Sequence, residues 1–156
     1  MHTIVSSSIE NIVQSVHKEF GSKAELFVPI MVRMDALDCD EFEATKVAGV
    51  YVFIHEDSGC LKVGKSHSNA SKRALQHCGN DNTSSKDRAV QMAQLRRSDK
   101  TYMLVFALQK HDSMHWVLAL EHFLEKTLRP RITSQRNGYQ RVSKGDRVGP
   151  ESSVGS

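Results

Sequence analysis

The chain has 156 residues, of which 39 % are hydrophobic and 25 % charged, a composition that suits one globular domain and excludes fibrous and globally disordered classes. Its formal net charge of +3 points only weakly to a polyanionic partner, and its longest apolar run, 103–108, is far short of the roughly 20 residues that span a bilayer. No secretory signal is visible at the start and the three cysteines form no close pair, so we expect reduced thiols, a cytoplasmic location and no membrane partner.

The first third of the chain contains one helical pattern and one interrupted strand pattern. Residues 8–20 place apolar side chains at helical spacing, and Gly21 ends this helix. Residues 24–32 are apolar enough for a strand, but Pro29 favours an edge position or a bend. The acidic stretch 35–43 predicts a surface loop or a short helix.

The middle of the chain predicts a hairpin, two helices and a buried strand. Residues 49–54 and 60–65 are rich in β-branched and apolar side chains and flank a polar turn that contains glycine, which is typical of a β-hairpin. Helices are predicted over 71–77 and 86–97. The run 101–109 has little polar interruption and predicts a buried strand.

One further helix completes the fold that the sequence predicts. Ser113 is the expected N-cap of a helix over 114–128, and Pro130 fixes its end. The order of elements indicates an α+β domain with a small, mainly antiparallel three-stranded sheet flanked by helices. We divide the chain into an N-terminal extension of unknown role that packs on or precedes the core (1–46), a core domain (47–142) and a flexible tail (143–156).

A carboxylate interrupts the apolar face of the last helix. Glu121 falls in the middle of an apolar stripe formed by Met114, Val117, Leu118, Leu124 and Leu128. Burying an unpaired carboxylate is costly, so a functional role, a salt bridge or a water-exposed stripe edge would each explain it. Glu125 lies near the same side and leaves these alternatives open.

Several basic and aromatic positions are similarly open. Arg73 and His77 are four residues apart, so they form either a phosphate-binding pair or a solvated helical face. Lys62 and Lys65 are ambiguous in the same way, and Tyr51 alone fits a core aromatic with its hydroxyl at the rim. A zinc site could be built from Cys60, His67, His77 and Cys78, but the spacings between these residues in the sequence match no established ligand pattern.

Four short motifs follow one another in a recognisable order. The first is Gly49-Val50-Tyr51, and the second is Leu61-Lys62-Val63-Gly64-Lys65-Ser66, separated from it by a hairpin turn. Arg73 and His77 follow on a helix, and Ala119-Leu120-Glu121-His122-Phe123-Leu124 lies before Arg129-Pro130-Arg131-Ile132. In this order and structural context, residues 47–140 resemble the GIY-YIG nuclease family, with Val50 in place of Ile in the first triplet.

The resemblance has three departures. Lys62 replaces the Tyr of the second triplet, as in a restriction-enzyme and phage-protein branch of the family. The family's later Asn would fall at Thr133, or else Asn137 or Gln140 could serve. Residues 1–46 match nothing in the family.

The resemblance implies that 47–142 is a nuclease domain that hydrolyses phosphodiester bonds in DNA. Glu121 would hold Mg²⁺ or another divalent cation such as Mn²⁺. Tyr51 would orient or deprotonate the attacking water, and Lys62 is suited to lower the pKa of that tyrosine. Arg73 would bind the scissile phosphate with support from His77. The expected DNA-binding residues are Lys65, Lys72, Arg96, Arg97, Arg129 and Arg131.

Two other functions remain as alternatives. One is a non-catalytic nucleic-acid-binding module on the same scaffold, although pure binding would not need a carboxylate near phosphate. The other is a structural or interaction protein in which Glu121 forms a salt bridge. Double-strand cutting by one active site would need a homodimer or two successive nicks, and the sequence does not choose between them.

Overall fold

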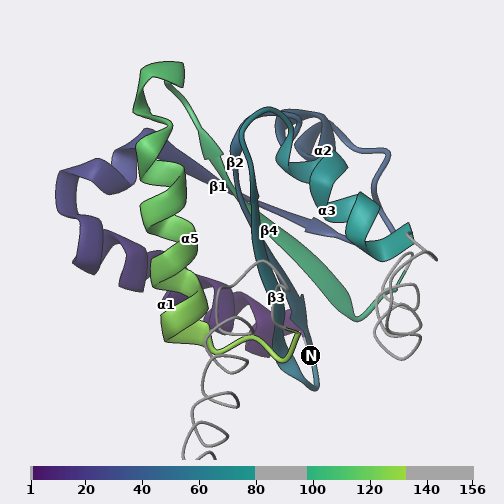
Figure 1. Ribbon diagram of the computed structural model, residues 1–156. Coiled ribbons are helices and arrows are strands. Elements are labelled where there is room, and N and C mark those ends of the chain that lie inside the picture. The colour runs from purple at the N-terminus through teal and green to yellow at the C-terminus, as the bar shows by residue number, and fades with distance from the viewer. Residues whose placement is uncertain (1, 80–97, 133–156) are drawn as a thin grey trace, which may run out of the picture.

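The computed structural model describes residues 2–79 and 98–132 (Figure 1). The helix expected over 86–97 and the tail 143–156 lie outside the described residues. In chain order the elements are α1 (His2–Phe20), the 3₁₀ helix η1 (Gly21–Leu26), β1 (Phe27–Arg33), α2 (Asp40–Ala44), β2 (Gly49–His55), β3 (Gly59–Ser66), α3 (Ala70–Gly79), β4 (Thr101–Leu108), the 3₁₀ turn η2 (His111–Ser113) and α5 (His115–Leu128).

The strands form one four-stranded sheet in the order β1-β4-β2-β3, and every neighbouring pair is antiparallel. Helices α1 and α5 cover one face of this sheet, and α2 and α3 cover the other (Figure 1). The predicted α+β class with an antiparallel sheet is therefore confirmed, and the sheet has one strand more than the three we expected.

The additional strand is β1, at one edge of the sheet. It pairs with β4 along all of its 7 residues, from Phe27 opposite Leu108 to Arg33 opposite Tyr102. Pro29 lies inside β1. An edge strand tolerates proline because the residue's missing N–H can face away from the only neighbouring strand, whereas an inner strand would lose a hydrogen bond of the sheet. Residues 1–46 thus contribute a strand to the same sheet as the hairpin, together with α1, whose Ile12 and Val16 are buried in the core.

The core has two parts, one on each face of the sheet, because successive residues of a strand point to opposite sides. On what we call the α5 face, Val50, Val52 and Val63 pack with Val117, Leu120 and Leu124 of α5. On the α3 face, Tyr51, Phe53, Met103 and Val105 pack with Ala70, Ala74 and Cys78 of α3. β4 is buried along its whole length because it lies between two strands and beneath helices on both faces, which explains its uninterrupted apolar sequence.

The ends of several helices test the predicted stop and start signals. Gly21 has a positive φ of 56° directly after α1, and α2 lies in the acidic stretch as a short helix, so both predictions are confirmed. Ser113 is not the N-cap of α5: Met114 is, and Ser113 belongs to η2. The helix ends at Leu128, as predicted from Pro130, and Arg129 follows as the C-cap residue with a left-handed φ of 47°.

The apolar stripe of α5 is rotated from the one we expected. Leu118 is 52 % exposed, whereas Val117, Leu120 and Leu124 are fully buried. The stripe is centred between Val117 and Leu124, so Leu118 falls about 100° away, toward solvent.

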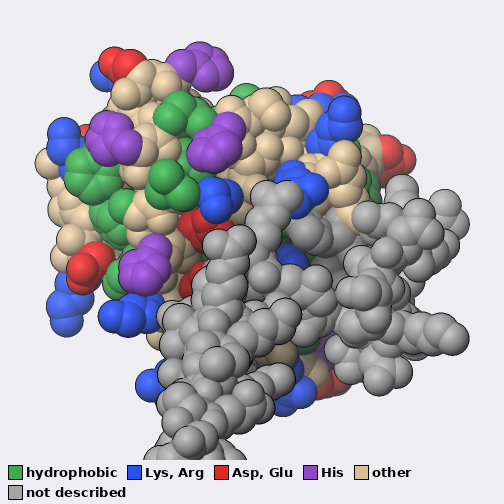
Figure 2. All heavy atoms as spheres, viewed as in Figure 1, with side chains coloured by type: hydrophobic (Ala, Val, Ile, Leu, Met, Phe, Trp, Pro, Cys, Tyr) green, Lys and Arg blue, Asp and Glu red, His purple; other side chains and the backbone are tan. Residues whose placement is uncertain are grey.

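Histidine and hydrophobic side chains lie together on the exposed surface over α1 and α5 (Figure 2). None of the described helices combines the length and apolarity that a membrane crossing requires.

Candidate active site

The two triplets lie side by side in the β2–β3 hairpin. Tyr51 is directly opposite Gly64, and Val50 is directly opposite Lys65. Residues that face each other across an antiparallel pair project to the same side of the sheet. Tyr51 and Gly64 therefore lie on the α3 face, and Lys65 lies on the α5 face.

Gly64 makes room for the phenol ring of Tyr51. A Cβ atom at position 64 would lie 2.7 Å from Tyr51 Cε2, and it would overlap Cζ and the hydroxyl oxygen even more closely. The far end of the phenol thus lies over the backbone of β3, which forms an edge of the sheet. Gly49 has a comparable reason to be glycine, because a Cβ there would lie 3.1 Å from the carbonyl carbon of Phe106 in β4.

Tyr51 and Lys62 are both buried on the α3 face. Tyr51 is 1 % exposed and packs edge-on against Phe53, with ring centroids 5.8 Å apart. Lys62 is directly opposite Phe53, so it is a diagonal neighbour of Tyr51 on the same face of the hairpin. The structure therefore places together the two residues that the sequence analysis expected to act as a unit.

Glu121 forms a salt bridge with Lys65. The Lys65 Nζ and Glu121 Oε2 atoms are 2.6 Å apart, and the two side chains are only 28 % and 15 % exposed. Of the three explanations offered for a carboxylate on this helix, the structure shows the salt bridge. The pair joins the edge strand β3 to α5 on the α5 face.

A polar turn positions α3 directly after β3. The backbone N–H groups of Ser68 and Asn69 donate to Ser66 Oγ at 3.2 and 3.0 Å. Asn69 Oδ1 in turn accepts a hydrogen bond from the Lys72 N–H at 3.0 Å and caps the helix. The sequence analysis missed this cap, although an Asn just before a helical segment is its usual signal. One turn into α3, half-buried Arg73 donates from Nη1 to Gln76 Oε1 at 3.4 Å.

The predicted catalytic residues are divided between the two faces of the sheet. Tyr51 and Lys62 lie on the α3 face, where α3 carries Arg73 and, one turn further, His77. The Glu121 carboxylate lies with Lys65 on the α5 face. The residues that the sequence analysis assigned to one catalytic site therefore do not all lie on one face of the sheet. The candidate site thus has two halves, one on the α3 face and one on the α5 face. They adjoin at β3, where Gly64 and Lys65 are consecutive residues.

The chain after α5 runs along the outer edge of β3. The N–H of Arg131 donates to the Cys60 carbonyl at 3.3 Å, and the N–H of Ile132 donates to the Leu61 carbonyl at 2.8 Å. Ile132 is buried in the cluster on the α3 face, so this segment passes from one face to the other. Because a strand rises about 3.3 Å per residue, the two bonded positions lie roughly 13–16 Å along β3 from Lys65, so residues 131 and 132 leave that end of the strand clear.

Of the expected DNA-binding residues, Lys72, Arg129 and Arg131 are exposed. Arg96 and Arg97 lie outside the described residues, as do the three candidates for the family's Asn, which are Thr133, Asn137 and Gln140. These three exposed residues occupy the start of α3 and the segment that follows α5, and Lys65 lies on β3.

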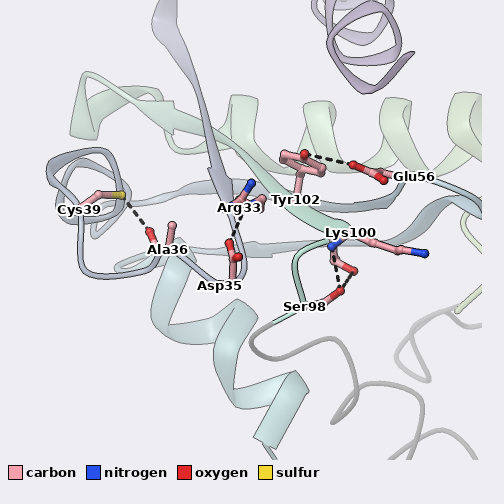
Figure 3. Close-up of polar contacts among 9 residues, drawn as sticks. Arg33, Asp35, Ala36, Cys39, Glu56, Ser98, Lys100 and Tyr102 are labelled. Atoms are coloured by element: carbon pink, nitrogen blue, oxygen red, sulfur yellow. Dashed lines mark hydrogen bonds and ion pairs between the residues drawn. The ribbon is translucent and has the colours of Figure 1, made fainter. Parts of the chain in front are cut away.

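A separate polar cluster stabilises the other end of the sheet (Figure 3). The Arg33 guanidinium pairs with the Asp35 carboxylate, and the Tyr102 hydroxyl donates to Glu56 Oε1 at 3.3 Å. Burial, followed by the nearby Glu56 carboxylate, raises the pKa of Tyr102. Tyr102 is paired with Ile54, three residues beyond Tyr51 along β2, so this cluster is distant from the end of β3 that carries Lys65.

The part of the chain that the structure describes holds no group of three or more His, Cys, Asp or Glu side chains able to bind a metal ion. This finding gives no support to the zinc alternative among those residues. Burial also raises the pKa of the Cys60 thiol to about 12. Such a thiol is protonated at neutral pH and is poorly suited to be a metal ligand or a nucleophile.

No protein-family model, curated protein or solved structure matches this chain.

Proposed function

We propose that the protein is a metal-dependent endonuclease of the GIY-YIG type that hydrolyses phosphodiester bonds in DNA. The observation that carries the proposal is the packing of Tyr51 over Gly64 in the hairpin. The tyrosine of one triplet and the glycine of the other are directly paired, and the ring occupies the space that any larger side chain at position 64 would fill. This packing explains why a tyrosine in the first triplet occurs together with a glycine in the second.

Glu121 is the side chain best suited to hold the cation. Lys65 of β3 pairs with its carboxylate, and the described residues form no group of three or more His, Cys, Asp or Glu side chains around it. A single carboxylate fits Mg²⁺, which dehydrates reluctantly and completes its shell with waters and substrate phosphate oxygens. When bound, the cation would supply Lewis-acid stabilisation of the phosphate and of the leaving oxygen.

The scissile phosphate would lie at the edge of β3, where the two halves of the site adjoin. Tyr51 reaches this strand from the α3 face and, as the phenolate left after its own proton has gone to solvent, would accept the proton of the attacking water. Arg73 would bind phosphate oxygens from α3, and Lys65 would bind them from β3. Because Gly64 has no side chain, the phenol lies over the backbone of β3, which is an edge strand of the sheet.

Two observations favour the alternative of a non-catalytic nucleic-acid-binding module. Tyr51 is 1 % exposed, and the Glu121 carboxylate already has a lysine partner at 2.6 Å. Under this alternative the hairpin would be a structural remnant of a nuclease, and Lys72, Arg129 and Arg131 would bind the DNA backbone without cutting it.

Incubation with supercoiled plasmid, with and without Mg²⁺, separates the two functions. The nuclease proposal predicts nicked or linear product only with Mg²⁺. Glu121→Gln should slow cutting by about 10²- to 10³-fold while DNA binding, measured by gel shift, is retained. Binding without any metal-dependent product would establish the binding module instead.

Glu125→Gln is the matched control, because Glu125 lies one turn further along the same helix and is half-buried like Glu121. This variant should cut plasmid at close to the normal rate. If Glu125→Gln abolishes cutting and Glu121→Gln does not, the metal-binding carboxylate is assigned to the wrong turn of α5.

A further inference from the structure

We infer that Lys65 is a built-in competitor of the divalent cation: its ammonium group occupies Glu121 in the metal-free protein and must leave that carboxylate oxygen before a cation binds there. This inference rests on the proposed function, since it concerns the same carboxylate. It goes further by making cation binding depend on a second residue, and by predicting a coupling between cation and phosphate.

The geometry of the pair is the first argument. Lys65 Nζ lies 2.6 Å from Glu121 Oε2, whereas a Mg²⁺ ion would bind a carboxylate oxygen at about 2.0–2.1 Å. The ammonium and the cation would therefore contend for the same oxygen, and their like charges would repel each other strongly at such a distance. The cation can bind this oxygen only if the lysine moves away.

The second argument is that the pair is partly buried and joins two elements. The side chains of Lys65 and Glu121 are 28 % and 15 % exposed, while those of the Lys46–Glu43 pair are 43 % and 65 % exposed. Lys46 and Glu43 are also near neighbours in sequence, whereas Lys65 is held opposite Glu121 by strand β3 and helix α5. Water screens the Lys65–Glu121 attraction less, so its ammonium competes more effectively.

DNA would relieve this competition. A phosphate at the edge of β3 offers the Lys65 ammonium another anion, and Glu121 is then left for the cation. Two ligands coupled in this way strengthen each other's binding by the same factor. The protein without DNA should therefore bind divalent cations weakly, and the complete metal site should form on the substrate.

The test measures Mn²⁺ binding to the DNA-free protein by the loss of the free-ion electron paramagnetic resonance signal. Lys65→Met should bind Mn²⁺ about tenfold more tightly than the unmodified protein. Lys65→Arg keeps the positive charge and should show no such gain. Adding Glu121→Gln to Lys65→Met should remove the gain in affinity. Urea unfolding of each variant serves as the control that it is folded at the assay temperature.

Lys46→Met is the matched control, because it frees Glu43, a carboxylate outside the candidate site, and makes the same change in net charge. It should change Mn²⁺ affinity by less than about twofold. Equal Mn²⁺ affinity in Lys65→Met and the unmodified protein would overturn the inference, as would a gain that survives Glu121→Gln. The plasmid assay decides the proposed function separately, since Mg²⁺-dependent cutting that requires Glu121 would stand in either case.

Discussion

Replacement of Gly64 by alanine would place a methyl group in space that the ring of Tyr51 occupies. The new Cβ would lie 2.7 Å from Cε2, so the ring or the strand must shift by about 0.7 Å to reach the 3.4 Å of ordinary contact, and further to clear Cζ and the hydroxyl. Tyr51 is 1 % exposed and packs against Phe53, so it has little room to move. Overpacking of a core costs about 1–3 kcal/mol, and alanine recovers about 0.5–1 kcal/mol of backbone entropy. The net fall in the free energy of unfolding should therefore be about 1–2 kcal/mol.

Urea unfolding measures this loss, and two further variants separate its causes. Gly59→Ala is the control for the backbone, because Gly59 has a φ of 75° and a Cβ atom added there would meet no other atom within 4 Å. Its cost should be about 1 kcal/mol and should come from the left-handed conformation alone. In the double variant Tyr51→Leu with Gly64→Ala, the smaller side chain leaves room for the methyl group. The double variant should therefore lose about 1–2 kcal/mol less than the two single losses together.

A loss below about 0.5 kcal/mol for Gly64→Ala would refute the reasoning, and so would strictly additive losses in the double variant. Either result would mean that the Tyr51 ring does not lie over Gly64 in solution. The same variant should also cut plasmid more slowly, because any shift of the ring displaces the phenolate oxygen that we propose accepts the proton of the attacking water.

Three other predictions concern catalysis, binding and pH. Tyr51→Phe should slow single-turnover cleavage by about 10²- to 10⁴-fold with little change in stability. If Tyr51 and Lys62 serve one step, adding Lys62→Met should increase that loss only slightly. Losses that multiply in the double variant would mean that Lys62 binds the phosphate instead. The affinity for duplex DNA should fall steeply with salt, and Lys72→Ala should reduce the slope of log affinity against log salt by about one; an affinity unchanged between low and moderate salt would point to a different ligand. Because burial raises the pKa of Cys60 from 9.0 to about 12, the neutral thiol contributes stability that is complete below about pH 9 and is lost as the pH rises toward 12. Cys60→Ala should flatten the decline in the free energy of unfolding over that range, and an identical decline in both proteins would contradict the assignment.

Local patterns in the sequence were enough to predict most of the elements. The hairpin, the buried strand β4 and the end of α5 before Pro130 all follow from side-chain periodicity and from residues that favour turns, whereas the acidic stretch left a surface loop and a short helix open. Such signals act within a few residues of the chain and need no knowledge of the packing. Pro29 likewise indicated an edge position or a bend, because its lack of an N–H group is a property of the residue itself, and the structure shows the edge position.

The tertiary structure alone decided which elements are neighbours and which face each side chain takes. β1 pairs with β4, a strand far along the chain, so local pattern did not show that this strand belongs to the same sheet as the hairpin. The exposure of Leu118 depends on how α5 rotates to pack on the sheet, and the Lys65–Glu121 pair depends on that same packing. The division of the candidate site between two faces follows from strand register, because Gly64 and Lys65 are adjacent in sequence and must point to opposite sides. Contacts between distant segments are set by the packing of the whole core, which no short stretch of sequence contains.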